Sequence, residues 1–219
     1  MITNKIIRGR FTGLRDIHIA EVLQDDNTGY KADTPFLLAR AIQAKTTIKS
    51  TSSEVDSENS AEYIEDTFQE GDLTLDVNDL SPQAKALLFG NKYDSTTGML
   101  FLNTGDRSNA VAVGWRGTRS NGCKQQLKWY YSVTFSPADE SFETSGKSTK
   151  AQSSQLKGTI LGRAIDGRYG VELDEEYLPA GTNPQELLTN WFSEVQEGNK
   201  NSSVITPGSS QIPAPTTQA

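Results

Sequence analysis

The sequence has little of the side-chain chemistry on which many enzyme and metal sites depend. Its 219 residues include one cysteine, Cys123, and one histidine, His18. A single cysteine excludes a disulfide within the chain and is typical of a protein made in a reducing compartment. Zinc sites take several Cys and His ligands, so these two residues do not supply one. His18 is the only imidazole available to a Ser–His–acid triad. Its place in an alternating run instead predicts a surface or half-buried strand residue, and Cys123 follows Asn121-Gly122 as a turn thiol.

Basic charge and long apolar runs are scarce as well. There are 21 Lys and Arg residues against 28 Asp and Glu, which gives a net charge of -7. Proteins that read nucleic acids need a basic face to neutralise phosphates, so this balance argues against tight DNA or RNA binding. No run approaches the roughly 18 to 20 apolar residues of a membrane span. The first residues, MITNKIIRGRFTG, lack the apolar core of a signal peptide. We expect a soluble acidic protein made in a cytoplasm.

The loops that bind phosphate or calcium are also missing. GWRGTRSNG (114–122) is rich in glycine, but it lies between two strand-like runs, whereas phosphate-binding loops open onto helices. DVNDLSPQA (76–84) lacks the spaced ligands, central glycine and terminal glutamate of an EF-hand loop. Carboxylates are too abundant for any one pair to stand out as a glycosidase-like pair. We therefore expect no catalytic residue, metal or cofactor.

What the sequence does contain is the pattern of a mainly β protein. Alternating or β-branched runs are separated by Gly, Asn, Asp and Pro clusters. The strands that this pattern predicts are 18–25, 36–51, 72–78, 98–103, 140–146, 155–165 and 168–176, with a tight hairpin turn at Asp166-Gly167 between the last two. A short helix is predicted after Ser81-Pro82, ending at Gly90, and a second over 183–198, whose apolar stripe packs on its own sheet.

The clearest hairpin is AVAVGWRGTRSNGCKQQLKWYYSVTF (110–135). On its first strand Val111, Val113 and Trp115 share one face, opposite to Arg116 and Thr118. On its second strand alternation predicts one apolar face, made of Leu127, Trp129, Tyr131, Val133 and Phe135. Burial of these side chains is worth about 1.5 to 3 kcal/mol each, so we expect a core hairpin of a sandwich or barrel.

Acidic residues are concentrated in one region. Ser50 to Leu80 contains ten acidic residues and no basic one. Its polar part, about 50–69, is predicted to be a long loop, and long loops are usually functional or disordered. GDLTLDVN (71–78) alternates as a strand with Asp72 and Asp76 on its polar face. After Gly198 the chain is too poor in apolar residues to bury a core, so 199–219 is expected to be a mobile tail.

Together these segments resemble the major tail (tail tube) proteins of long non-contractile-tailed phages of Gram-positive bacteria. GLRDIHIAEVLQDDNTGYKADTPFLLARAIQAKTTI (13–48) resembles that family's opening, a strand, a turn and a second strand. The acidic stretch with the short helix (52–90) and the hairpin with its continuation (110–146) follow in the family's order. The similarity covers about Gly13 to Glu176. Ser145-Gly146 and QSSQLKGTI (152–160) depart from the family's pattern, as does the tail.

The resemblance implies an antiparallel β-sandwich or barrel-like tail tube fold with a flanking helix, a long loop and a short C-terminal helix. It divides the chain into an N-terminal arm (1–12), the tube domain (13–198) and the tail. Hexameric rings would stack into a virion tube that DNA passes without specific binding, assembled in the host cytoplasm with tape measure, tail terminator and distal tail proteins. Asp72 and Asp76 are the candidates for the lumen. The candidates for subunit or ring contacts are Glu54, Asp56, Glu58, Glu62 and Tyr63.

Two other classes of function remain open from the residues alone. A monomeric carbohydrate- or ligand-binding β-sandwich would place surface aromatics such as Trp115 and Tyr130 along a cleft. A hydrolase would use clustered carboxylates. For the lumen candidates, an outward solubilising face is the alternative, and for the 50–69 stretch it is an ordinary mobile loop.

Overall fold

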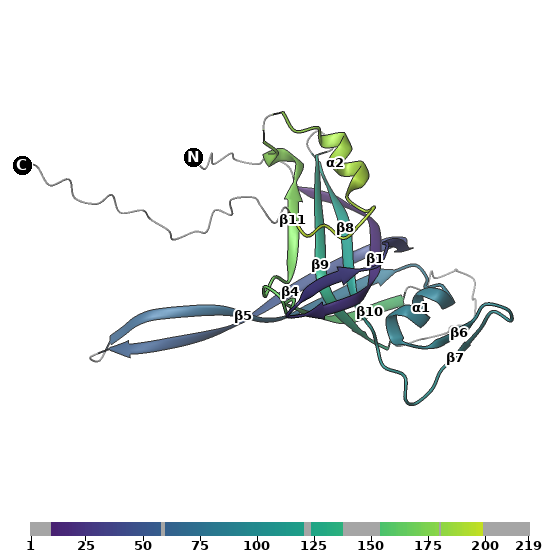
Figure 1. Cartoon of the computed structure of the whole chain (residues 1–219). Coiled ribbons are helices and arrows are strands. Elements are labelled where there is room, and N and C mark those ends of the chain that lie inside the picture. The colour runs from purple at the N-terminus through teal and green to yellow at the C-terminus, as the bar shows by residue number, and fades with distance from the viewer. Residues whose placement is uncertain (1–9, 58–59, 121–123, 138–153, 180, 199–219) are drawn as a thin grey trace, which may run out of the picture.

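The chain folds mainly into antiparallel β-strands, as the sequence predicts (Figure 1). The computed structural model describes residues 10–57, 60–120, 124–137, 154–179 and 181–198, without the side chains of 52–66. The strands are β1 (Phe11–Asp26), β2 (Gly29–Ala32), β3 (Phe36–Ala39), β4 (Ala41–Ser57), β5 (Ser60–Val77), β6 (Lys92–Asp94), β7 (Met99–Phe101), β8 (Ala110–Arg119), β9 (Gln125–Ser136), β10 (Ser154–Leu161) and β11 (Gly170–Asp174). The helices are α1 (Pro82–Phe89), the 3-10 turn η1 (Glu175–Tyr177) and α2 (Pro184–Asn190).

The strands close into a barrel. Hydrogen bonds join them in the order β2-β1-β8-β9-β10-β5-β4, and β3, which leads directly into β4, pairs with β1. The bend at Arg40 between β3 and β4 therefore connects the two ends of the sheet. The barrel interior is apolar and is filled by side chains from β1, β3, β5, β8, β9 and β10: Ile17, Ile19, Leu38, Leu73, Leu75, Val77, Val111, Val113, Val133, Phe135, Leu156 and Ile160. Their burial supplies the main driving force of the fold.

Helix α1 covers one end of the barrel and has local signals at both ends. The Ser81 hydroxyl accepts a hydrogen bond from the Ala84 N–H at 3.2 Å, and Pro82 occupies the first turn. Gly90 ends the helix with φ 68°, in the left-handed region that glycine adopts readily. Ala84 and Leu88 are buried in the barrel core. The prediction of this helix is confirmed.

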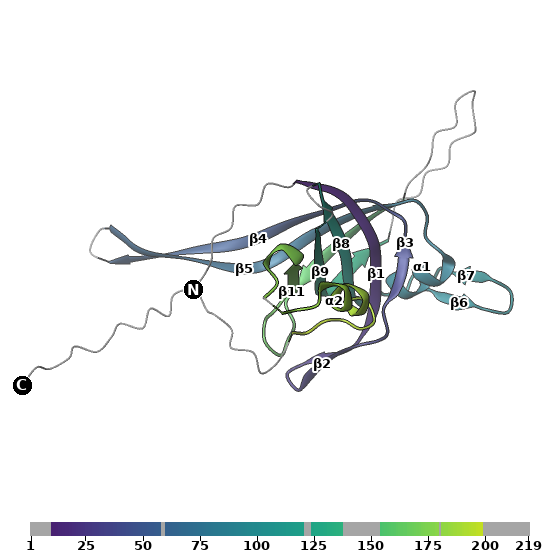
Figure 2. The same ribbon diagram turned by 90° about the horizontal axis from the view of Figure 1, so that it is seen from above.

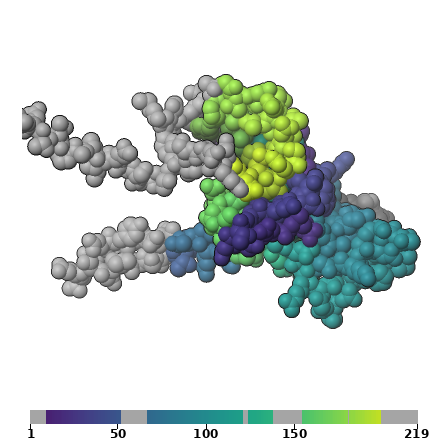
Figure 3. Space-filling model, viewed as in Figure 1, coloured from purple at the N-terminus to yellow at the C-terminus, as the bar shows by residue number. Residues whose placement is uncertain are grey.

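Helix α2 lies on the outside of the sheet, over β8, β9 and β11 (Figure 1), and the yellow-green segment that contains it forms part of the molecular surface in Figure 3. Its Leu188 is buried with Trp191, Leu127 and Trp129, which confirms that the segment packs on its own sheet. The helix is shorter than the 183–198 predicted, because it stops at Asn190. The reason is a long-range contact, since the carbonyl of Trp191 accepts a hydrogen bond from Trp129 Nε1 at 3.2 Å instead of continuing the helix.

A bulge in β9 corrects the prediction of a single apolar face. Val111 pairs with Val133 and Val113 with Tyr130, so Tyr131 and Ser132 together oppose Ala112. The extra residue exchanges the faces of the strand on either side of it. Leu127 and Trp129 therefore pack beneath α2, whereas Val133 and Phe135 point into the barrel. The predicted grouping holds within each half of the strand and fails across the bulge.

The predicted hairpin at Asp166-Gly167 is also wrong. β10 and β11 both pair with β9, one after the other along the same edge, and no ladder joins them to each other in the described part of the chain. The 162–169 segment is an excursion between two collinear strand segments. It is closed by a hydrogen bond from the Arg163 N–H to the Arg168 carbonyl at 2.9 Å. Gly167 has the positive φ, 70°, that the Asp-Gly turn predicts. The strands on either side of the turn nevertheless pair with β9 and not with each other.

The predicted long loop over about 50–69 is a β-hairpin. β4 and β5 stay paired from Ala41↔Val77 to Ser57↔Ser60. β10 accompanies β5 only as far as Gly71, so residues 49–70 continue as a two-stranded extension, the β4–β5 ribbon. Figures 1 and 2 show it projecting away from the barrel. The ladder satisfies the backbone N–H and C=O groups of a segment whose polar composition alone predicts a loop.

Some expectations concern residues outside the described part of the chain. These are the strand at 140–146, most of the N-terminal arm, the tail at 199–219 and the turn that holds Cys123. Within the part that the structure describes, no helix is long and apolar enough to cross a membrane.

Candidate functional site

His18 is a packing residue of β1. Its ring stacks on Phe192 with centroids 4.2 Å apart, and its Nδ1 lies 2.9 Å from the Asp16 carbonyl oxygen. Arg116 lies over the same phenyl ring at 5.7 Å and forms an ion pair with Asp16. These contacts tie β1 and β8 to the chain that follows α2. Among the described residues, no group of three or more His, Cys, Asp or Glu side chains is placed to hold a metal ion.

The two lumen candidates lie on the outer face of the barrel wall. Asp72 and Asp76 alternate with buried neighbours on β5, as predicted. Asp72 Oδ1 lies 3.0 Å from Lys49 Nζ, and Gln155 donates a hydrogen bond to Asp76 Oδ1 at 2.9 Å. The hydrogen bonds that Lys49 makes to Glu70 and Asp72 raise its pKa. The outer face of β5 is therefore acidic, but its carboxylates are paired with Lys49 and Gln155.

The contact candidates fall on the β4–β5 ribbon. Glu54 and Asp56 belong to β4, and Glu62 and Tyr63 belong to β5. In the ladder Glu54 is opposite Ile64, and Val55 is opposite Tyr63. Glu58 lies outside the described residues. The structure thus gathers four of the five candidates near the far end of one projecting element.

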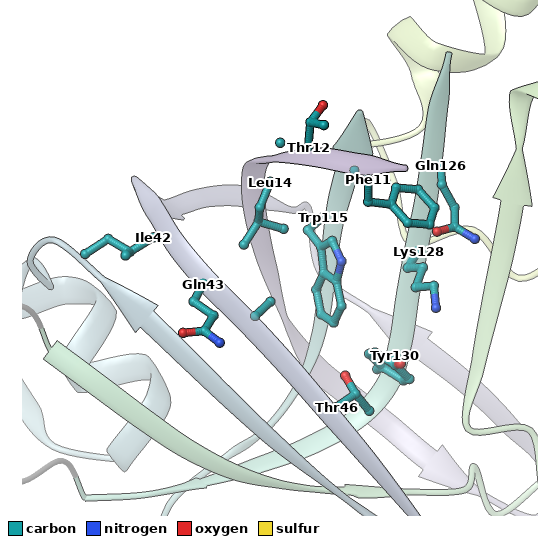
Figure 4. A pocket seen from close by; sticks show the side chains of 13 residues that line it. Phe11, Thr12, Leu14, Ile42, Gln43, Thr46, Trp115, Gln126, Lys128 and Tyr130 are labelled. Atoms are coloured by element: carbon teal, nitrogen blue, oxygen red, sulfur yellow. The ribbon is translucent and has the colours of Figure 1, made fainter. Parts of the chain in front are cut away.

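A cavity that the sequence did not predict opens where β1 and β4 diverge. β3, which leads into β4, pairs with β1 at residues 17–19 of β1. No ladder joins β1 to β4 itself in the described part of the chain. The resulting opening, the seam slot, has a volume of about 480 Å³. Figure 4 shows its lining, which comes from the start of β1, the start of β4, the end of β8 and the start of β9: Phe11, Thr12, Gly13, Leu14, Ile42, Gln43, Ala44, Thr46, Trp115, Gly117, Gln126, Lys128 and Tyr130.

The seam slot has a mixed lining, in which polar side chains such as Gln43, Gln126 and Lys128 stand beside aromatic rings, and an exposed apolar rim. Trp115 and Tyr130 lie side by side on its floor with ring centroids 5.3 Å apart. At the rim Phe11 is 50% exposed and Ile42 is 53% exposed. Its volume falls within the range of about 300 to 1,000 Å³ that is usual for binding pockets. Apolar side chains left in water around a formed cavity indicate a surface that receives a partner.

The signal for this slot was only partly present in the sequence. Trp115 and Tyr130 stood out as aromatic residues on β-strands, and the structure brings them together. Phe11 and Ile42 gave no signal, because nothing local shows that β1 and β4 separate at their first residues.

Comparisons with known proteins lead to solved structures rather than to relatives in sequence. No protein-family model matches the chain, and no curated protein matches it either. Among solved structures, the chain is similar to the anti-feeding prophage cap, described as a tube terminating cap. The TM-score is 0.43 and the sequence identity 7%, and the alignment covers 78% of this chain and 96% of that chain. A likeness at this level does not establish a shared family.

Proposed function

We propose that the chain is a structural phage tail protein whose copies assemble into hexameric rings that stack into the tail tube. DNA would pass through this tube without specific binding. The proposal places the protein in the virion after assembly in the host cytoplasm, with tape measure, tail terminator and distal tail proteins as its partners. It assigns the chain no catalytic step. The resemblance over Gly13 to Glu176 supports it, and the β4–β5 ribbon carries it.

The ribbon is the observation that calls for another subunit. Over residues 49–70 the ribbon has only two strands, and both of its outer edges lack a partner strand among the described residues. An isolated two-stranded hairpin is marginally stable in water, and free strand edges tend to pair with other chains. A projecting element on one copy and a different receiving surface on the next make a head-to-tail contact. Such a contact gives a closed ring when the rotation closes.

Shortening the ribbon tests this proposal. Residues 52–66 are replaced by Asn-Gly, which joins the paired positions Thr51 and Thr67 through a tight turn. Full-length protein is expected to give rings or tubes in negative-stain images, and the shortened chain to stay monomeric by light scattering with an unchanged circular dichroism spectrum. A full-length protein that is strictly monomeric at high concentration contradicts the proposal, as does unchanged assembly of the folded, shortened chain.

One observation favours a second candidate. Trp115 and Tyr130 line the same cavity beside Gln126 and Lys128, which is the combination of stacking faces and hydrogen-bond donors that a sugar ring can use. Under this reading the chain is a monomeric carbohydrate- or ligand-binding β-barrel. Titration with a panel of oligosaccharides distinguishes the two: saturable binding by a persistent monomer favours the ligand-binding function.

A further inference from the structure

The seam slot combines a preformed cavity with unpaired backbone. Within the described part of the chain, no strand pairs with the β1 side that faces β4 along Phe11–Leu14, and the outer side of β4 faces the same opening from Ile42 to Thr46. Such edges accept an added strand, while pockets beside them select its side chains. The slot therefore fits an extended polypeptide segment that carries one or two large apolar side chains.

Three cations flank the seam slot in sequence without lining it: Arg15 follows Leu14, Arg40 precedes β4, and Lys45 lies between Ala44 and Thr46 on the outer face of β4. Arg15, Arg40 and Lys45 are exposed, and none has an ion pair in the described part of the chain. The neighbouring acids are neutralised, since Asp16 pairs with Arg116 and Glu172 pairs with Lys128 at 2.8 Å. An occupant with acidic residues would be attracted to this rim.

The far half of the β4–β5 ribbon has the matching chemistry. Val55 and Tyr63 are directly paired in the ladder, and Tyr63 is the only aromatic residue between 50 and 67. Six acidic residues and no basic one lie in the same stretch: Glu54, Asp56, Glu58, Glu62, Glu65 and Asp66.

The ribbon of one copy cannot fill its own slot. Thirteen residues of extended strand separate Ile42, at the rim of the slot, from Val55. At about 3.3 Å per residue this is roughly 40 Å. The ribbon also points away from the barrel in both views (Figures 1 and 2). The acidic ribbon end that matches the cations beside the slot must therefore come from a second copy of the chain.

We propose that the Val55–Tyr63 end of the β4–β5 ribbon docks into the seam slot of a neighbouring copy, with its acidic residues against Arg15, Arg40 and Lys45. This inference rests on the proposed function, because it names the receiving surface of the head-to-tail contact. It also gives Trp115 and Tyr130 a role as the apolar floor against which the incoming side chains pack.

Cysteine cross-linking tests the contact directly. In a Cys123→Ser background, Tyr63→Cys is combined with Ile42→Cys and the protein is assembled under mild oxidation. A ladder of disulfide-linked oligomers is expected on non-reducing gels, with the 42–63 linkage identified by mass spectrometry, because a disulfide needs Cα atoms about 4.4 to 6.8 Å apart. The matched control combines Tyr63→Cys with Leu102→Cys, since Leu102 is an apolar residue that is 76% exposed and lies outside the slot lining. This control is expected to give no ladder.

Charge exchange provides a second readout. Arg40→Glu with Lys45→Glu is expected to weaken self-association at least tenfold in sedimentation velocity experiments. Addition of Glu54→Lys and Asp56→Lys to the same chain is expected to restore it. Lys92→Glu with Arg107→Glu changes two exposed cations away from the slot and serves as the control.

The outcomes separate this inference from the proposed function. Rings that form without the 42–63 linkage, and that are insensitive to the Arg40 and Lys45 changes, overturn the docking site and leave the tail function standing. A protein that is monomeric under all conditions overturns both. Cross-linking with rescue by charge exchange supports both.

Discussion

At the scale of single residues, Gly114 shows how tightly the outer face of the sheet is packed. A Cβ atom at this position would lie 2.6 Å from the Trp129 ring and 2.9 Å from the Lys128 carbonyl oxygen. The carbonyl belongs to a paired strand and the indole is fully buried, so neither can move freely. Gly114→Ala is therefore predicted to destabilise the fold by about 1 to 3 kcal/mol, the usual cost of overpacking.

Urea unfolding followed by tryptophan fluorescence measures this cost. The control is Gly105→Ala, because a Cβ atom there meets no atom within 4 Å. It is predicted to change stability by less than about 0.5 kcal/mol. Equal unfolding midpoints for the two variants would show that the strand can shift away from Trp129.

Residues of this kind were partly predictable from sequence. The glycines of GWRG stand between strand-like runs, which indicates packing rather than a phosphate site. The partner of Gly114 was not predictable, because Trp129 reaches it only through the register of β8 against β9.

At the scale of elements, the chain after α2 is fastened to the sheet by a buried arginine. Arg163 is 4% exposed, and its guanidinium lies 4.3 Å from the centre of the Tyr131 ring. It pairs with Glu197 at 2.8 Å and with Asp166. The Tyr131 hydroxyl donates a hydrogen bond to the Gln196 carbonyl at 2.9 Å. Burial raises the pKa of Tyr131 to about 12 and also raises the pKa of Tyr30.

This arrangement predicts alkaline sensitivity. A tyrosine with a raised pKa in the folded state stabilises the fold fully below its unfolded pKa of about 10 and loses that contribution as pH rises through the folded value. The urea midpoint is therefore expected to fall progressively between pH 10 and pH 12.

Tyr131→Phe should lower the free energy of unfolding by about 0.5 to 1.5 kcal/mol at pH 8 through the lost hydrogen bond, and should make the alkaline fall of the urea midpoint shallower. Tyr169→Phe, at a residue that is 36% exposed, is the control and is expected to keep the wild-type slope. An identical slope for wild type and Tyr131→Phe would contradict the assignment.

Elements were predictable where their signals are local. Ser81, Pro82 and Gly90 define α1 within ten residues of sequence, and the structure has the same boundaries. The end of α2, the bulge at Tyr131 and the β4–β5 ribbon depend on partners far along the chain. The acidic composition of 50–69 resembles that of a loop, and only the ladder between β4 and β5 makes it a ribbon.

At the scale of the whole molecule, the fold class followed from the strand pattern, but the seam slot did not. The slot exists because the connection through β3 joins β1 and β4 at one point and leaves them apart beyond it. The hydrophobic periodicity of β1 or of β4 does not indicate over how many residues the two strands stay side by side. The resemblance supplied an expectation of assembly, and the ribbon and slot turn that expectation into two specific surfaces.

The charged outer face of β4, β5 and β10 gives the last prediction. Lys45, Lys49 and Lys157 lie there beside Glu70, Asp72 and Asp76. If this face lines the tube, Asp72→Lys with Asp76→Lys replaces two negative side chains by two positive ones and so shifts the net charge of the face by +4 in every copy. The substituted side chains are exposed or half-exposed and the Lys49 pair is a surface pair, so folding and tube assembly are expected to persist. Attraction between the new cations and DNA phosphates would then retard the passage of DNA.

The measurement is the yield of DNA delivered by particles that carry the doubly substituted protein, relative to tubes counted in negative stain. Glu186→Lys with Glu194→Lys reverses two exposed charges in and just after α2, which covers other strands of the barrel, β8, β9 and β11, and is expected to leave delivery unchanged. Adding salt should reduce the defect of the Asp72 and Asp76 variant, because screening shortens the reach of the new charges to about 8 to 10 Å. Normal delivery by that variant at low salt would place Asp72 and Asp76 on the outside of the tube, where their pairing with Lys49 and Gln155 serves solubility alone.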